Sequence, residues 1–273
     1  MPAAHISHSP AMPSFKKVVL YTGNVMRTSV AGRNANVHKK SNKELYTAID
    51  DTLKTSISAT TTPSYRYYSD EELLEIPDLR FSSVIPEDCR GDVEVTAKLF
   101  YLNRVYPASH IDQAIEHLQK ILAVKSIDTF IVSTADQQLE DIKEAWQSLE
   151  NHVQNGTVKA LGVSDYSHAQ LEAFLNHEEI KVKPTIDQIN VAHCCNLPTD
   201  LIDLAKRNQV ELLHNGDSLD MLSDEELTSL FRSHNVIDSE KTLKPRWVVK
   251  YHVFVKCRSV VADKGYIVLG DSA

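Results

Sequence analysis

Three short apolar runs, separated by segments with helical spacing, constrain what this chain can fold into. They lie at residues 160–163, 186–191 and 210–213, and each is too short to form a helix. In the segments between them, apolar residues recur three and four positions apart, as in a helix that buries one face. This alternation predicts parallel strands joined by crossover helices.

The connecting segments also carry signals for where their helices begin. Ser167 can cap a helix whose inner face carries Leu171 and Phe174, and Pro198 suits the first turn of the next helix. In a barrel of such units, the loops after the strands share one rim, and the chemistry of the fold is found there. We therefore expect functional residues at three strand ends: residues 164–165, 190–195 and 214–217.

Similar patterns extend along the rest of the chain. The other expected strands are residues 17–22, 81–85, 93–100, 129–132 and 259–262. The other expected helices are residues 41–53, a short one from Asp70, 107–124, 139–153, 218–231 and 245–257. Together they predict an α/β fold, a (β/α)8 TIM barrel, and 273 residues is a length that one such barrel can occupy.

The domain organisation follows from the same reading. Residues 1–14 are polar and contain three prolines, so we expect a disordered tail. Residues 15–273 are expected to form a single domain, in which residues 55–70 have no apolar period and form an insertion or a long loop.

Charge and hydropathy exclude several classes of protein. A net charge of −8 argues against nucleic acid or an anionic membrane surface as the main partner. No apolar run approaches the roughly 18 residues that cross a bilayer, and the first residues lack the apolar core of a signal peptide. The chain is therefore expected in the cytoplasm, with its four cysteines as reduced thiols.

A metal site is not expected from this sequence. The cysteines lack the C-x-x-C spacing of a zinc site. His193, Cys194 and His214 gather near the expected rim, but no fourth ligand stands at a suitable spacing.

Two motifs carry a resemblance to a known family. The strand ends GVSDYS and QINVAHCC resemble the aldo-keto reductases, in which a Gly-Val-Ser-Asn turn and a strand glutamine hold the nicotinamide. The runs HCCNLPTDLIDLAK, HNGD and KCRSVVADKGYI resemble one branch of that family, the regulatory subunits of glutamate–cysteine ligase. That branch is non-catalytic.

The resemblance implies a barrel of aldo-keto reductase type that is degenerate or truncated at its C-terminus. It also implies a partner, the catalytic subunit of the ligase, whose activity and resistance to feedback by glutathione would rise in the complex. The implied role is thus regulatory, in glutathione synthesis.

The catalytic residues of the family are mostly missing from the sequence. In the family a tyrosine donates the proton, a lysine paired to an aspartate lowers its pKa, and a histidine helps to polarise the carbonyl. Lys98 stands at the lysine position and Ser133 at the histidine position, while nothing between Gly23 and Val93 matches the aspartate and tyrosine pattern. The resemblance therefore implies no catalytic residue, with Lys98 as a relic.

The cofactor site of the family is reduced as well. Ser164 and Gln188 remain, whereas Asp165 replaces an asparagine and so loses an amide donor. His214 takes the place of a stacking aromatic residue, and Lys264 aligns with a phosphate-binding lysine. Only nine residues follow Lys264, too few for the helix that grips the adenosine phosphate. We expect no cofactor, although these residues leave room for weak NADP binding.

Three cysteines are candidates for partner contact or redox chemistry: Cys194, Cys195 and Cys257. The alternative for the adjacent pair is a buried structural role, since cysteine is among the residues most often buried. Two other functions stay open for the whole chain. One is an active NADPH-dependent aldo-keto reductase that acts on small carbonyl compounds with a relocated proton donor, and the other is a barrel-shaped scaffold for a different partner.

Overall fold

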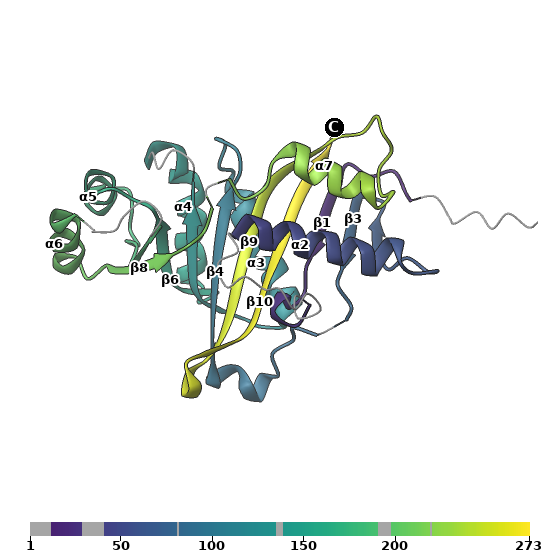
Figure 1. Cartoon of the computed structure of the whole chain (residues 1–273). Coiled ribbons are helices and arrows are strands. Elements are labelled where there is room, and N and C mark those ends of the chain that lie inside the picture. Colours follow the sequence, from purple (N-terminus) through teal and green to yellow (C-terminus); the bar gives the residue numbers. More distant parts are fainter. Residues whose placement is uncertain (1–11, 29–40, 81, 135–138, 191–197, 219) are drawn as a thin grey trace, which may run out of the picture.

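An open ten-stranded sheet organises the chain (Figure 1). The computed structural model describes residues 12–28, 41–80, 82–134, 139–190, 198–218 and 220–273. Its strands follow the order β2-β3-β1-β10-β9-β4-β5-β6-β7-β8 across the sheet. The strands are β1 (Lys17–Tyr21), β2 (Arg66–Tyr68), β3 (Leu73–Pro77), β4 (Val93–Tyr101), β5 (Ile127–Ser133), β6 (Val158–Ser164), β7 (Ile186–Asn190), β8 (Glu211–Asn215), β9 (Leu243–Val255) and β10 (Val260–Ser272).

Helices connect most of these strands. The α-helices are α1 (Val25–Thr28), α2 (Ser41–Leu53), α3 (Ala108–Leu122), α4 (Leu139–Gln154), α5 (His168–Asn176), α6 (Thr199–Arg207) and α7 (Asp224–Ser233). A π-helical segment, η2 (Lys54–Ser58), continues α2, and two 3-10 segments are η3 (Glu87–Asp92) and η5 (Lys256–Arg258). Within the described ranges, no helix is long and apolar enough to cross a membrane.

The parallel half of the sheet confirms the predicted strand-helix alternation. Strands β4 to β8 pair in parallel, in chain order, and a helix follows each of β4, β5, β6 and β7. Ser167 caps α5 as expected, because its hydroxyl accepts from the Gln170 amide while the Gln170 side chain accepts from Ser167. The α/β class is therefore confirmed.

The C-terminal elements differ from the prediction. Residues 245–257, expected as a helix, form most of strand β9, and the expected strand 259–262 is the start of the 13-residue strand β10. The buried residues Trp247, Val249, Tyr251 and Val253 alternate along β9, which is the period of a strand. The helix prediction was wrong because Val248, on the opposite face of β9, is apolar and buried as well, so that apolar residues also fall at helical spacing.

The second expected strand was also misplaced. Residues 82–86 have no regular structure, and strand β3 precedes them. The short helix expected from Asp70 is wrong, since these residues make a turn and enter β3, which pairs in parallel with β1.

The sheet is not closed into the expected eight-stranded barrel. The β9–β10 hairpin stands between β1 and β4 and pairs antiparallel with both. Because β10 and β3 occupy the two edges of β1, β1 has no free edge with which to pair β8. The long hairpin is thus the physical reason for the open sheet.

Helices cover both faces of this sheet. One core cluster contains Trp247, Val249 and Tyr251 of β9 together with apolar residues of α3 and α4. The other contains Val248 and residues of α2 and α7, and Figure 1 shows these two helices crossing the same face of the hairpin. Strand β9 therefore contributes to both cores.

Candidate functional site

A cavity of about 490 Å³ lies between the β4–β9 pair and the ends of β7 and β8. Its lining residues are Glu94, Thr96, Lys98, Gln188, Leu213, His214, Asn215, Gly216, Asp217, Lys250, His252 and Phe254. A volume of this size is typical of sites that hold small molecules.

The register of β4 and β9 places charged side chains on one wall of this cavity. Lys98 stands opposite Lys250 and Thr96 opposite His252. Since alternate residues of a strand point to the same face, these residues share the cavity wall with Glu94. The wall is therefore built by the C-terminal hairpin as well as by the parallel half of the sheet.

Asp217 joins the two lysines at the inner end of the wall. The Lys98 ammonium lies 3.1 Å from Asp217 Oδ2, and the Lys250 ammonium lies 2.5 Å from Oδ1. The side chains of Lys98, Asp217 and Lys250 are 5%, 6% and 14% exposed. This Lys–Asp–Lys cluster is thus nearly removed from water. Because little water is present to screen them, its charges interact strongly.

Burial and pairing act in opposite directions on the pKa values of the cluster. Burial raises the pKa of Asp217, but the Lys250 and Lys98 ammoniums outweigh it and hold that pKa below its ordinary value. Burial lowers the pKa of Lys98 below its ordinary value, and the Asp217 carboxylate offsets part of that shift. The carboxylate is therefore ionised at neutral pH.

Two asparagines hold the Asp217 backbone in place. The Asp217 amide donates to Asn215 Oδ1 over 2.9 Å, and Asn190 Nδ2 donates to the Asp217 carbonyl. Asn190 ends β7 and Asn215 ends β8. The strand ends that the sequence singled out as functional thus position the carboxylate that binds Lys98.

His252 adds a neutral ring to the same wall. Burial, with the Lys250 and Lys264 ammoniums, lowers the pKa of His252 to about 3. The ring is therefore uncharged at neutral pH and cannot serve there as a protonated acid.

The structure separates the two residues at catalytic positions of the family. Lys98 lines the cavity described above, whereas Ser133 lines another cavity together with Phe100, Thr134 and Met221. The Lys98 ammonium contacts Asp217 and lies 4.9 Å from the centre of the Phe100 ring. Among the described residues, the Lys98 ammonium therefore contacts a carboxylate and no tyrosine hydroxyl.

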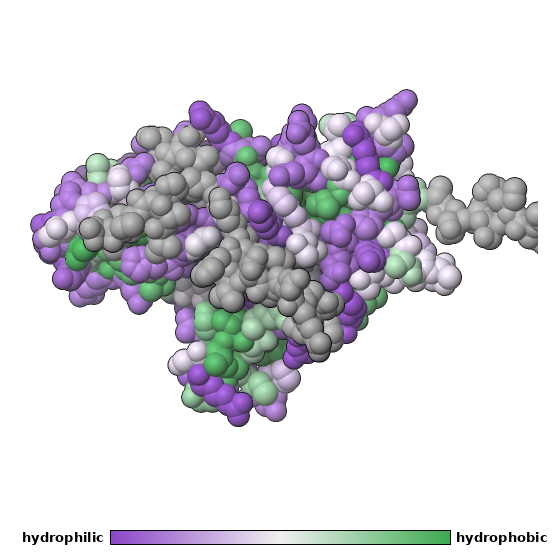
Figure 2. All heavy atoms as spheres, in the orientation of Figure 1, coloured by the Kyte–Doolittle hydropathy of each residue, from purple (hydrophilic) through white to green (hydrophobic). Residues whose placement is uncertain are grey.

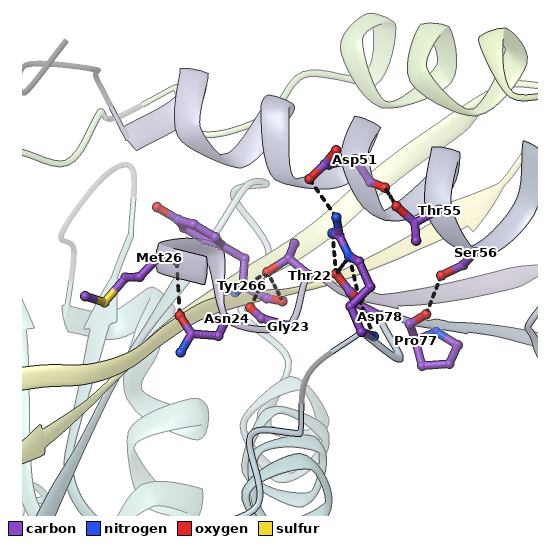
Figure 3. A network of polar contacts seen from close by, with 11 residues as sticks. Thr22, Gly23, Asn24, Met26, Asp51, Thr55, Ser56, Pro77, Asp78 and Tyr266 are labelled. Carbon is purple, nitrogen blue, oxygen red and sulfur yellow. Dashed lines mark hydrogen bonds and ion pairs between the residues drawn. The ribbon is translucent and has the colours of Figure 1, made fainter. Parts of the chain in front are cut away.

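Between Gly23 and Val93, one aspartate lies directly after strand β3, but its carboxylate is already bound by an arginine. Asp78 comes directly after β3, and its carboxylate accepts hydrogen bonds from Arg80 Nε at 3.0 and 3.1 Å and from Nη2 at 2.6 Å. Arg80 also reaches Asp51 of α2 at 3.0 Å, in a polar network beside Thr22 and Gly23 (Figure 3). Asp78 therefore ties α2 to the sheet instead of pairing with Lys98.

The residues expected at a cofactor site are largely engaged with one another. The Ser164 hydroxyl lies 2.7 Å from Asp165 Oδ2 and 3.2 Å from the Gln188 carbonyl. Asp165 adopts a φ of 63°, and its other carboxylate oxygen accepts from the Asn190 amide at 2.6 Å. These hydrogen bonds link the end of β6 to the neighbouring strand β7.

The other expected cofactor residues are divided between two places. Gln188 and His214 line the cavity, while Lys264 on β10 makes a 2.5 Å ion pair with Glu44 of α2. A dinucleotide held as the family holds it would need the Ser164 hydroxyl and the Lys264 ammonium free. The residues present do not fit that arrangement.

Free thiols lie at the far end of the β9–β10 hairpin. Cys257 is exposed in η5, and the Lys256 ammonium of the same turn donates to the Gly91 carbonyl of η3 at 2.9 Å. Exposed Cys89 lies in that segment, and the Asp88 carboxylate raises the pKa of its thiol. Apolar surface gathers at this end, where Val260 is 49% exposed (Figure 2). The expected partner or redox candidates Cys194 and Cys195 lie outside the described residues.

No cluster of metal-binding side chains occurs in the described ranges. The sequence missed Lys250 and His252 as site residues because it placed them on a helix. The alternation of residues 247–253 is the signal that could have found them.

Known proteins resemble most of this chain. The family model described as the aldo/keto reductase family matches residues 66–258. The glutamate–cysteine ligase regulatory subunit of Homo sapiens is 29% identical over 231 residues, which are 82% of each chain. That of Rattus norvegicus is 32% identical over 190 residues, 67% of this chain and 68% of the relative.

A more distant relative and a solved structure extend the comparison. A protein of Schizosaccharomyces pombe named putative glutamate–cysteine ligase regulatory subunit is 26% identical over 93% of this chain and 96% of its own. A solved aldo/keto reductase from Brucella melitensis aligns with a TM-score of 0.40 and 22% identity, over 53% of this chain and 54% of that one. The chain belongs to the aldo/keto reductase family and, within it, to the glutamate–cysteine ligase regulatory subunits.

Proposed function

We propose that this chain is a non-catalytic subunit that binds the catalytic subunit of glutamate–cysteine ligase in the cytoplasm. In the complex it raises ligase activity and reduces feedback inhibition by glutathione. The observation that carries the non-catalytic part is that, among the described residues, the Lys98 ammonium contacts the Asp217 carboxylate and no tyrosine hydroxyl. The names of the relatives support the regulatory part.

The proposed regulation requires a difference in binding free energy. The chain must bind the active conformation of the catalytic subunit more tightly than the inhibited one, since a ligand that binds both equally shifts nothing. A coupling free energy of about 1–3 kcal/mol is typical and corresponds to a change of roughly 5- to 150-fold in an affinity. Glutathione would then bind the complex more weakly than it binds the catalytic subunit alone.

Reconstitution with the purified catalytic subunit tests this proposal. The ligase rate is measured against glutathione concentration with and without the chain, and complex formation is followed by analytical ultracentrifugation. We expect a stable complex and a glutathione inhibition constant raised by about fivefold or more. A ligase whose rate and inhibition constant are the same with and without a saturating amount of the folded chain contradicts the proposal.

The second candidate is an NADPH-dependent reductase that acts on small carbonyl compounds. The observation in its favour is the match of the reductase family model to residues 66–258. We propose instead that affinity for NADP(H) is weak, because Ser164, Asp165 and Lys264 are engaged within the protein. Titration with NADPH separates the two. Tight binding with carbonyl turnover that Lys98→Met abolishes would favour the reductase.

A further inference from the structure

The cavity beside Lys98 is lined by two lysine side chains and by one carboxylate that is shielded from solvent. Lys98 and Lys250 supply two ammoniums, and Asp217 supplies one carboxylate that both of them share. The second carboxylate of the lining, Glu94, is exposed to solvent. Because water screens the Glu94 charge, Asp217 is the one buried carboxylate that the lining offers to both ammoniums, and burial lowers the pKa of Lys98 despite it.

A lysine ammonium is costly to bury without a carboxylate of its own. A neighbouring lysine adds positive charge, since Lys264 on β10 stands next to His252 in the sheet register, although Glu44 pairs with it. A bound anion would compensate the charge, and the cavity of about 490 Å³ leaves room for one. One further carboxylate would give each of the two lysines a counter-charge.

Unused hydrogen-bond donors line the same cavity. Each lysine ammonium has three N–H donors, and the side-chain acceptor recorded for each is one oxygen of Asp217. Asn215 Nδ2 is buried and has no partner among the described residues, while Asn215 Oδ1 accepts from the Asp217 amide. The Asn215 side chain is therefore held in place by its Oδ1 atom, while its Nδ2 donor has no partner. A buried donor without a partner is destabilising.

The remaining lining favours an organic anion over an inorganic one. Leu213 and Phe254 supply apolar surface, and both are partly buried. We propose that this cavity binds a small monocarboxylic acid. Its carboxylate contacts the Lys98 and Lys250 ammoniums and the Asn215 amide, and its hydrocarbon part packs against Leu213 and Phe254. The site is independent of the proposed ligase partnership and requires no dinucleotide.

Thermal unfolding of the full-length chain with matched probes tests the site. Butyrate supplies a carboxylate on a short hydrocarbon, butyramide has the same shape without the charge, and inorganic phosphate is an anion without the hydrocarbon. A ligand that binds only the folded state raises the unfolding temperature in a saturable way. We expect saturable stabilisation by butyrate at neutral pH and constant ionic strength, and none by butyramide.

Two variants locate the effect. Lys250→Met leaves Lys98 and Asp217 as a balanced pair and should weaken butyrate binding by more than about tenfold. Lys159→Met is the matched control, because Lys159 forms an ion pair with Asp128 at the surface and lies outside the cavity lining. Its butyrate affinity should equal that of the unchanged chain.

A second measurement uses the unchanged chain, in case Lys250→Met does not fold. Acetic anhydride labels accessible lysines, and mass spectrometry reports the rate at each one. Butyrate should slow the labelling of Lys250 and leave that of Lys159 unchanged. Equal effects of butyrate and butyramide, stabilisation by phosphate alone, or unchanged labelling of Lys250 at saturating butyrate would each overturn the proposal.

Discussion

The Lys98 ammonium lies 3.1 Å from the Asp217 carboxylate, in a part of the protein from which water is nearly excluded. Asp217 follows β8, and Lys98 lies on β4, so this contact joins two strands that the open sheet does not pair. Lys250 of the C-terminal hairpin binds the same carboxylate. Lys98, which stands at the position of the family's catalytic lysine, thus helps to hold the open sheet together.

Removing different members of the Lys–Asp–Lys cluster should have unequal effects on stability. Asp217→Ala leaves two buried ammoniums without a carboxylate, and we expect a loss of roughly 3–5 kcal/mol in the free energy of unfolding. Lys98→Met leaves Asp217 paired with Lys250, and we expect a smaller loss. Urea denaturation of both variants measures the difference. A larger loss for Lys98→Met would contradict this account of the cluster.

Two partly buried histidines, His252 and His117, predict a loss of stability in mild acid. His252 has a pKa of about 3 and His117 a pKa of about 4 in the folded chain, both below the usual 6.5, chiefly because of burial. In the unfolded chain both bind protons below about pH 6.5, so the folded state is favoured above that pH and loses this advantage as the pH falls.

Each histidine should contribute a slope of about 1.4 kcal/mol per pH unit between about pH 6 and its folded pKa. The free energy of unfolding, measured by urea denaturation at a series of pH values, gives this slope. His252→Gln should reduce it by the contribution of one histidine. His234, which is paired with Asp50 near the surface, supplies the control His234→Gln. An unchanged slope in His252→Gln would show that His252 does not titrate as described.

Close packing in the hairpin predicts that replacing Gly265 by a larger residue destabilises the fold. A Cβ atom at Gly265 would lie 2.4 Å from Tyr251 Oη and 2.5 Å from the Gly23 carbonyl oxygen, and a backbone atom cannot easily move aside. We expect Gly265→Ala to cost about 1–3 kcal/mol. At Gly91 a Cβ meets nothing within 4 Å, so Gly91→Ala is the control and should change stability by little. Equal unfolding free energies for the two variants would argue against this packing.

The parallel half of the fold could be predicted because its signals are local. Ser167 and the spacing of Leu171 and Phe174 define α5 without reference to the rest of the chain. The hairpin could not be predicted in the same way. Val248 is buried in one core and Val249 in the other, which interrupts the alternation of apolar and polar residues along β9, so its apolar residues fit a helical period as well as a strand period.

The candidate site was predictable only in part for the same reason. Lys98 could be predicted as a site residue from its place in the family pattern. Residues 214–217 could be predicted because the ends of parallel strands form the functional rim of such a fold. Lys250 and His252 enter the cavity through the antiparallel pairing of β9 with β4, which joins segments about 150 residues apart. Nothing local in the sequence encodes that pairing.

The network that ties α2 to the sheet gives the last prediction. Asp78 is buried, and the Arg80 guanidinium binds it through two nitrogens while it also reaches Asp51. Arg80→Met leaves the Asp78 carboxylate buried without a counter-charge, and we expect a loss of roughly 3–5 kcal/mol. Arg80→Lys keeps the charge but not the planar fork, and it should recover only part of that loss.

An exposed ion pair provides the comparison for Arg80. Lys125 and Glu87 lie 3.2 Å apart with side chains 93% and 90% exposed, and such pairs contribute about 0–1 kcal/mol. Lys125→Met should therefore leave the unfolding midpoint in urea almost unchanged, whereas Arg80→Met lowers it strongly. If the two variants had equal midpoints, the Asp78 carboxylate would have to be solvated in the folded chain, and the attachment of α2 to the sheet would have to rest on its apolar residues alone.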